Sequence, residues 1–256
     1  MITDILLVLT GIVVGVMNGV AGGGMLIGFP ILLATGMPAL VANATSNIIV
    51  LPGQISSAYG YRSYLRQIPH GYLLLAIPCV IGAGIGATIL RNTSPARFEE
   101  LVPGLIVFAV LLFTFQPCLH FTMRRHINGP KKHRASLRPI IPIAILMLPL
   151  AVYGGYFGVG FGFIMLALLG FSKLKELHQM NALKNLMAVA IATTSLIFLS
   201  GAHLIDWRHG LFMAFGTGVG GYIGSISAQH YSSHTIRVVV IAIGVTTATY
   251  LVFRSY

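Results

Sequence analysis

Apolar residues form long runs along this chain, and polar residues gather mainly in the short gaps between the runs. The runs cover residues 4–35, 38–61, 68–91, 97–119, 139–170, 177–201, 207–228 and 235–253. A helix that crosses a hydrocarbon core of about 30 Å needs about 20 mostly apolar residues. The pattern therefore predicts an all-α, polytopic membrane protein with about eight transmembrane helices.

Two of these runs, 4–35 and 139–170, are longer than one crossing requires, because a helix rises about 1.5 Å per residue. Both are interrupted by glycines, namely Gly22, Gly23, Gly24, Gly158, Gly160 and Gly162. Glycine favours breaks in a helix because it adopts backbone conformations that other residues avoid. The first and fifth predicted helices are therefore expected to be broken or re-entrant.

Composition supports the membrane class. Hydrophobic residues make up 56% of the 256 positions, charged residues 8%, and only five residues are acidic. A soluble fold cannot cover its surface with so few polar groups. The predicted helices also use nearly the whole length, so the chain has no room for a separate soluble domain.

The formal net charge of +11 would suggest nucleic-acid binding in a soluble protein. Six of the 16 Lys and Arg residues fall within 124–138, however, between two predicted helices. We interpret this segment as a cytoplasmic loop that contacts anionic lipid headgroups, with no nucleic-acid partner. Basic residues favour the cytoplasmic side, so both chain termini are expected in the cytoplasm together with Arg62 and Arg66.

The strongest internal signal is a repeat with an offset of 138 positions. The matched pairs include Gly22 with Gly160, Gly24 with Gly162, Asn43 with Asn181, Asn47 with Asn185, and Ser57 with Ser195. We interpret residues 1–118 and 139–256 as two homologous four-helix membrane repeats, joined by a basic linker at 119–138. Four crossings per repeat would give both the same orientation, whereas re-entrant segments would change that count. Parallel and inverted arrangements both stay open.

The glycine breaks offer candidate anion sites. A broken helix exposes backbone N–H groups, and the helix that follows presents a partially positive amino end. The candidate cradles contain Gly22, Gly23, Gly24, Gly160 and Gly162. The alternative is that these glycines only let helices pack closely.

Each repeat then has a helix with the pattern Asn-Ala-x-x-Asn, which places two carboxamides on one helix face. The candidate residues are Asn43, Ser46, Asn47, Asn181, Lys184 and Asn185. The carboxamides either connect helices or line a solute path. Lys184 replaces Ser46 of the first repeat, and an ionisable residue inside a membrane predicts a functional site for an anion. The alternative interpretation of Lys184 is that its long side chain only carries the ammonium group to the membrane surface.

Other chemistry is poorly supported. Cys79 and Cys118 stand alone in apolar segments, and His230 with His234 lacks further metal ligands nearby. The sequence contains no phosphate-binding loop, nucleophile elbow or paired carboxylates. We therefore expect no enzyme activity, no metal and no cofactor.

Several segments together resemble one known family. They are NGVAGGGMLIGFPILL at 18–33, GGYFGVGFGFIMLALL at 154–169, NALKN at 181–185 and LIDWRHG at 204–210. This pattern resembles the TauE/SafE family of sulfite exporters, over nearly the whole chain. The resemblance implies a bacterial or archaeal inner-membrane protein that moves sulfite, sulfoacetate or related anions. It implies roles for the matching glycines and Lys184, although Val20 stands where members often have a glycine.

Residues and resemblance together predict an anion transporter with its site between the two repeats. The oxyanion would be held by helix amino ends, Asn carboxamides and Lys184, and the repeats would rock to expose it to each side in turn. No acidic residue lies in the middle of a predicted span, so uniport, or symport through backbone and Asn oxygens, fits better than a carboxylate proton relay. The alternatives are a passive anion channel and a non-transporting assembly or sensor subunit.

Overall fold

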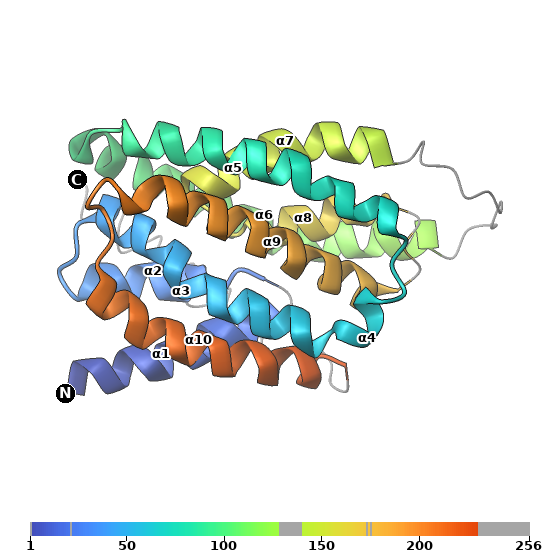
Figure 1. The fold of residues 1–256 in the computed structure, drawn as a ribbon, viewed down its shortest axis with the longest axis horizontal. Coiled ribbons are helices and arrows are strands. Elements are labelled where there is room, and N and C mark those ends of the chain that lie inside the picture. Colours follow the sequence, from blue (N-terminus) through green and yellow to red (C-terminus); the bar gives the residue numbers. More distant parts are fainter. Residues whose placement is uncertain (1, 21, 128–139, 173, 175, 230–256) are drawn as a thin grey trace.

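The computed structural model describes residues 2–20, 22–127, 140–172, 174 and 176–229, which form helices and no strands (Figure 1). These are α1 (Ile2–Val20), α2 (Met25–Ala34), α3 (Ala39–Gly60), α4 (Arg62–Leu65), the 3₁₀ helix η1 (His70–Leu75), α5 (Ala76–Arg91), α6 (Pro95–Ile127), α7 (Ile140–Tyr156), α8 (Phe161–Leu169), α9 (Leu177–Ser200) and α10 (Trp207–Ser227). The predicted helix at 235–253 and most of the basic linker lie outside the described residues.

The helices have the length and surface that a bilayer requires. Among the described residues, three segments are both long and apolar enough to cross a membrane: Thr3–Val20, His70–Arg91 and Leu177–Ser200. Large apolar side chains such as Ile77, Ile145 and Phe215 are more than half exposed on the outer surface. Such a surface is stable only against lipid, so the chain is a polytopic membrane protein.

Both predicted helix breaks are confirmed. The helix α1 ends before Gly22 and α2 begins after Gly24, while α7 ends before Gly158 and α8 begins after Gly160. Gly22, Gly23, Gly158 and Gly160 have φ angles of 101°, 79°, 72° and 77°. This left-handed region is readily adopted only by glycine, so these residues end the helices.

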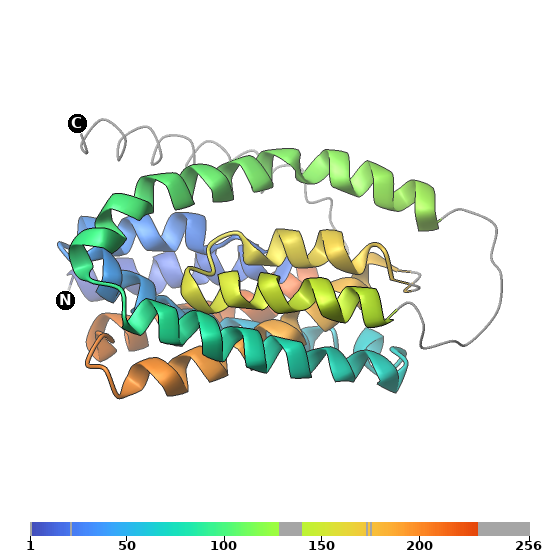
Figure 2. The same cartoon turned by 90° about the horizontal axis from the view of Figure 1, so that it is seen from above.

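The pairs α1–α2 and α7–α8 form helical hairpins. Gly24 and Gly28 lie against Val14, and Gly28 also contacts Met213 near the start of α10. The helix α2 therefore returns along α1 toward the end of the molecule where the chain begins. Figure 2 shows α7 and α8 forming a similar hairpin that enters from the opposite end.

Helices α3 and α9 run in opposite directions. Gln179, near the start of α9, donates a hydrogen bond to Gln67, beyond the end of α3. Conversely, Asp206, which follows α9, donates its backbone N–H to Thr45 near the start of α3. The two helices related by the 138-residue offset thus have opposite orientations. The repeat itself stays a prediction, but only an inverted arrangement agrees with these directions.

The expected side of the N-terminus needs a correction. Asp4 pairs with Arg208 at the start of α10, where α3 also begins, whereas Arg62 and Arg66 follow the opposite end of α3. The predicted orientation, which placed the N-terminus with Arg62 and Arg66, requires residues 4–35 to count as one complete crossing. Because α2 turns back instead, the N-terminus does not share a side with Arg62 and Arg66.

Close helix contacts join the two predicted repeats. Gly11 and Gly15 of α1 face main-chain atoms of α10, and Gly82 and Gly86 of α5 face main-chain atoms of α7. The helix α10 also packs on α3, and α5 packs on α9. Helix α10 of the second predicted repeat therefore packs on α1 and α3 of the first, and α5 of the first packs on α7 and α9 of the second. The two predicted repeats thus exchange helices and do not form separate bodies.

Candidate functional site

A small cavity lies where the two hairpin tips meet α3 and α9. Its volume of about 60 Å³ has room for several water molecules or one small ion, since a single water needs about 10–15 Å³. Seven predicted site residues line it: Gly22, Gly23, Ser46, Asn47, Gly160, Gly162 and Lys184. Asn18 and Gln54 line it as well, although the sequence analysis did not select them.

The hairpin tips touch through their glycines. A Cβ atom added to Gly22 would lie 3.1 Å from the Cα atom of Gly162, and the reverse substitution gives 3.2 Å. A Cβ atom on Gly23 would lie 2.1 Å from the ring of Phe163. Residues with side chains would therefore push the tips apart and alter the cavity between them.

Lys184 places an ammonium group in this buried setting. The residue is only 1% exposed, and its Nζ donates a 2.9 Å hydrogen bond to the backbone oxygen of Asn18. Within the described part of the chain, this is its one hydrogen bond, and no carboxylate pairs with it. An ammonium has three N–H donors, so two remain for another acceptor.

The contact with Asn18 has a structural cause. In a continuous helix the oxygen of Asn18 would accept from the N–H of Gly22, but that N–H bonds to Met17 instead. The break thus leaves the Asn18 oxygen without its helical partner, and Lys184 supplies a donor. A cation is favourable there because the carboxyl end of a helix is partially negative.

The second hairpin has a neutral version of this contact. Asn43 of α3 donates from Nδ2 to the backbone oxygen of Tyr156, at 2.7 Å. Tyr156 ends α7 and lies 138 positions after Asn18. In both hairpins, a side chain from a long helix of the other predicted repeat thus bonds to the carbonyl at the break.

Asn18 takes part in two hydrogen bonds at the first helix break. Its Oδ1 accepts from the backbone N–H of Gly24 at 2.9 Å, and its backbone oxygen accepts from Lys184. Its Nδ2 is buried and has no partner among the described residues. The repeat comparison missed it because Tyr156 occupies the matching position; its place in the glycine-rich segment 18–24 was the available signal.

The remaining predicted residues serve different places. Asn43 and Gly24 take part in the contacts at the hairpins, while Ser46 and Asn47 line the cavity and donate to backbone oxygens of their own helix. Asn181 and Asn185 are buried in α9 but do not line the cavity. The structure thus brings Ser46, Asn47, Lys184 and four of the five predicted glycines together, and leaves Gly24 and three asparagines outside the lining.

Helix α9 contains an unusual number of unpaired polar atoms. Asn181 Oδ1, both side-chain polar atoms of Asn185, and Ser195 Oγ are buried without a partner among the described residues. Unpaired buried polar groups are rare in folded proteins and point to water, a ligand or a second conformation. Several polar side chains of α9 therefore lack hydrogen-bond partners among the described residues in this state.

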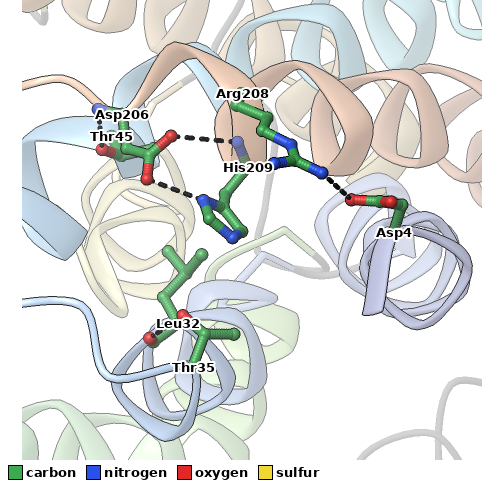
Figure 3. A network of polar contacts seen from close by, with 7 residues as sticks. All are labelled: Asp4, Leu32, Thr35, Thr45, Asp206, Arg208 and His209. Carbon is green, nitrogen blue, oxygen red and sulfur yellow. Dashed lines mark hydrogen bonds and ion pairs between the residues drawn. The ribbon is translucent and has the colours of Figure 1, made fainter. Parts of the chain in front are cut away.

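A second polar cluster lies where α1, α3 and α10 begin (Figure 3). Asp206 Oδ1 accepts from the backbone N–H of His209 at 3.1 Å and caps α10, and Oδ2 lies 2.7 Å from His209 Nδ1. Burial alone would raise the pKa of Asp206, but these contacts with His209 outweigh it and lower that pKa. Asp206 also accepts no bond from the cavity residues, so the cluster connects helices at the membrane face.

Comparison with known proteins gives a consistent result. The profile of the family described as "Sulfite exporter TauE/SafE" matches residues 7–251. A "Probable membrane transporter protein" of Haemophilus influenzae is 30% identical, covering 93% of this chain and 91% of its own. A Sinorhizobium relative described in similar words is 28% identical, covering 92% and 87%. The Escherichia coli K12 relative YfcA is 26% identical, covering 94% and 87%. No solved structure matches the chain.

Proposed function

The chain belongs to the sulfite exporter TauE/SafE family, and from this premise we propose that it transports a small anion across the bacterial or archaeal cytoplasmic membrane. The proposed substrate is a sulfur-containing oxyanion such as sulfite or an organosulfonate. The family and the relatives' descriptions indicate a membrane transporter rather than an enzyme. The preference for an anion rests on one observation, the buried ammonium of Lys184 beside the hairpin tips.

The energetic argument starts from the burial of that charge. Removing an ammonium group from water costs several kcal/mol unless a partner compensates for it. The single bond to the Asn18 oxygen uses one of three donors, and the described residues supply no carboxylate. An anion in the cavity would provide the missing charge and accept the free N–H groups, which supports Lys184 as part of the substrate site.

The glycine tips complete the proposed site. The backbone N–H groups of Gly23 and Gly160 donate no hydrogen bond within the described residues, and both glycines line the cavity. Free N–H groups near the amino end of a helix suit an anion. The proposed site therefore consists of Lys184, Ser46, Asn47 and the tip glycines Gly22, Gly23, Gly160 and Gly162.

Alternating access follows from two inverted repeats that meet at this cavity. The long helices α3 and α9 begin at Ala39 and Leu177, which are 138 positions apart, and this agreement supports the proposed duplication. Rocking of one bundle against the other would open the site to each side in turn. The unpaired atoms of α9 support such a motion, because another state can give them water or protein partners.

The positions of the other charged residues bear on the energy coupling of transport and on the orientation of the protein in the membrane. No acidic residue lines the cavity, so we favour uniport, or symport through neutral oxygens, over a carboxylate relay. Arg62 and Arg66 lie at one membrane face, which the positive-inside rule assigns to the cytoplasm. The N-terminus is then proposed to lie on the other face. The basic segment 124–138 is proposed to contact anionic lipid headgroups.

The test combines binding and transport by the purified protein. Thermal unfolding is measured with sulfite, sulfate, thiosulfate, sulfonates, carboxylates and phosphate, since a ligand of the folded state raises its stability. Proteoliposomes then report uptake of the best ligand. Saturation and counterflow support a transporter, whereas flux without either supports a passive channel. The absence of any anion-dependent stabilisation and flux would favour an assembly or sensor subunit.

A further inference from the structure

We propose that Asn18 is a specificity-determining residue, whose Nδ2 donates a second hydrogen bond to the oxyanion held by Lys184. This inference rests on the proposed anion transport and deepens it. Asn18 lines the same cavity as Lys184, is 4% exposed and is joined to Lys184 through its own backbone oxygen.

The orientation of the Asn18 carboxamide is fixed by its surroundings. The oxygen and nitrogen of a carboxamide look alike, so their positions are assigned from their partners. Gly24 offers an N–H, which requires an acceptor, and the atom 2.9 Å away must therefore be Oδ1. The other atom is consequently Nδ2, which has two N–H groups to donate.

These N–H groups lack an acceptor in the protein. Asn18 Nδ2 is buried without a hydrogen-bond partner among the described residues. Leaving such a donor unpaired costs about 1–3 kcal/mol, which is a reason to expect that another molecule satisfies it. Asn18 lines the cavity, which has room for such a molecule, and a small shift of the side chain would bring the buried Nδ2 to it.

The pair of donors indicates the class of ligand. The ammonium of Lys184 and the Nδ2 of Asn18 belong to different helices, and each supplies hydrogens without accepting any. A ligand with two or more unprotonated oxygens can engage both donors through separate atoms. Asn18 therefore favours oxyanions such as sulfite or a sulfonate over a monatomic anion such as chloride, which would have to lie within hydrogen-bonding distance of both donors at once.

The decisive variant is Asn18→Asp, which is nearly isosteric. Its carboxylate can still accept from the Gly24 N–H, but it replaces the free donor with a negatively charged acceptor. We expect the apparent Kd for methanesulfonate or sulfite, from anion-dependent thermal stabilisation, to rise at least about tenfold. Asn92→Asp makes the same change at an exposed position outside the cavity and should retain the parental Kd. A parental Kd for Asn18→Asp would overturn the proposal.

Acidification separates a hydrogen-bonding role from a structural one. Lys184 is the one ionisable side chain among the cavity-lining residues, and methanesulfonate keeps its charge across the acidic range. When the introduced carboxyl is protonated, it regains an O–H donor and loses its negative charge. Methanesulfonate affinity of Asn18→Asp should then recover relative to the parent, and no recovery would contradict the assigned donor.

A second variant covers the case in which Asn18→Asp does not fold. Asn18→Ser shortens the side chain without adding charge, and should weaken sulfite binding about tenfold while changing chloride binding less. Equal losses for both anions would overturn the proposed selection of oxyanions. If the parent binds no anion, the proposed function fails along with this inference. If the parent binds and the Asn18 variants bind equally well, this inference alone fails.

Discussion

The two hairpins have the same architecture but different chemistry at their breaks. At the first, the oxygen of Asn18 accepts from the charged ammonium of Lys184; at the second, the oxygen of Tyr156 accepts from the neutral carboxamide of Asn43. Both contacts satisfy a carbonyl that loses its helical partner. Only the first brings an ionisable group into the protein interior.

This difference between the hairpins distinguishes a structural role, satisfying a carbonyl, from the role in substrate preference that we propose for Lys184. A neutral carboxamide is enough to satisfy a carbonyl, as Asn43 does, so the charge of Lys184 is not needed for that purpose. The charge is costly to bury, and it faces a cavity lined by glycines from both hairpins. The shared contact therefore maintains the hairpins, whereas the amine of Lys184 is the group on which the proposed anion binding rests.

The largest effect should come from separating the two tips. In Gly23→Ala, the new Cβ would collide with the ring of Phe163 in a left-handed conformation. We expect the free energy of unfolding in detergent to fall by roughly 2–5 kcal/mol. Gly36→Ala is the matched control, because Gly36 has a φ of 86° but no atoms near its Cβ position. Equal losses in both variants would show that the tip contact contributes nothing.

Removing the charge tests the chemical difference between the hairpins. Lys184→Met keeps much of the side-chain volume but removes the donors and the charge. Anion uptake by proteoliposomes should fall by about a hundredfold, while the protein stays folded. Arg208→Met removes an exposed charge at the membrane face and should transport at nearly the parental rate. Parental uptake by Lys184→Met would exclude the assigned role.

Removing the neutral contact tests the other hairpin. Asn43→Ala leaves the oxygen of Tyr156 without the carboxamide donor, so stability should fall by about 1–3 kcal/mol. Because Asn43 does not line the cavity, the apparent Kd for the anion should change less than in Lys184→Met. Parallel measurement of thermal unfolding and anion binding checks this. A loss of affinity as large as that of Lys184→Met would mean that the two contacts share one role.

The smallest effect is expected far from both tips, at the cap of α10. Asp206→Asn weakens the contacts with His209 and should cost about 1 kcal/mol at neutral pH without changing anion affinity. The pKa of Asp206 in the folded protein lies below its ordinary value of 3.8. The carboxylate therefore stabilises the folded protein fully at a pH above 3.8, and this stabilisation is lost as the pH falls through the folded-state pKa. Thermal unfolding of parent and variant should therefore converge in strong acid; a constant difference would contradict this assignment.

The helix breaks show how far local sequence information reaches. Glycines such as Gly22 and Gly160 adopt left-handed conformations that other residues avoid, so the breaks could be located from the sequence. The direction of the chain after each break could not, because it depends on packing such as that of Gly28 against Met213. The assumption that α1 and α2 cross together wrongly grouped the N-terminus with Arg62 and Arg66, which lie at the opposite end of the molecule.

The candidate site shows the same limit. Lys184 could be selected from the sequence because a charge within an apolar segment is conspicuous. Asn18 could not, since its role depends on two partners, Gly24 nearby and Lys184, which lies 166 positions away. The offset of 138 positions favoured Asn181 and Asn185, yet their burial outside the cavity lining depends on how α9 packs.

The sequence by itself determined the membrane class, the helical segments, the position of the breaks and the lysine on which the proposed anion preference rests. These properties follow from hydrophobicity and backbone preference, which act within a few residues. Only the tertiary structure decided that the hairpins turn back, that α3 and α9 run in opposite directions, and that Asn18 meets Lys184. Those features depend on contacts between residues that are far apart in the sequence, and the packing of whole helices decides which of these residues meet.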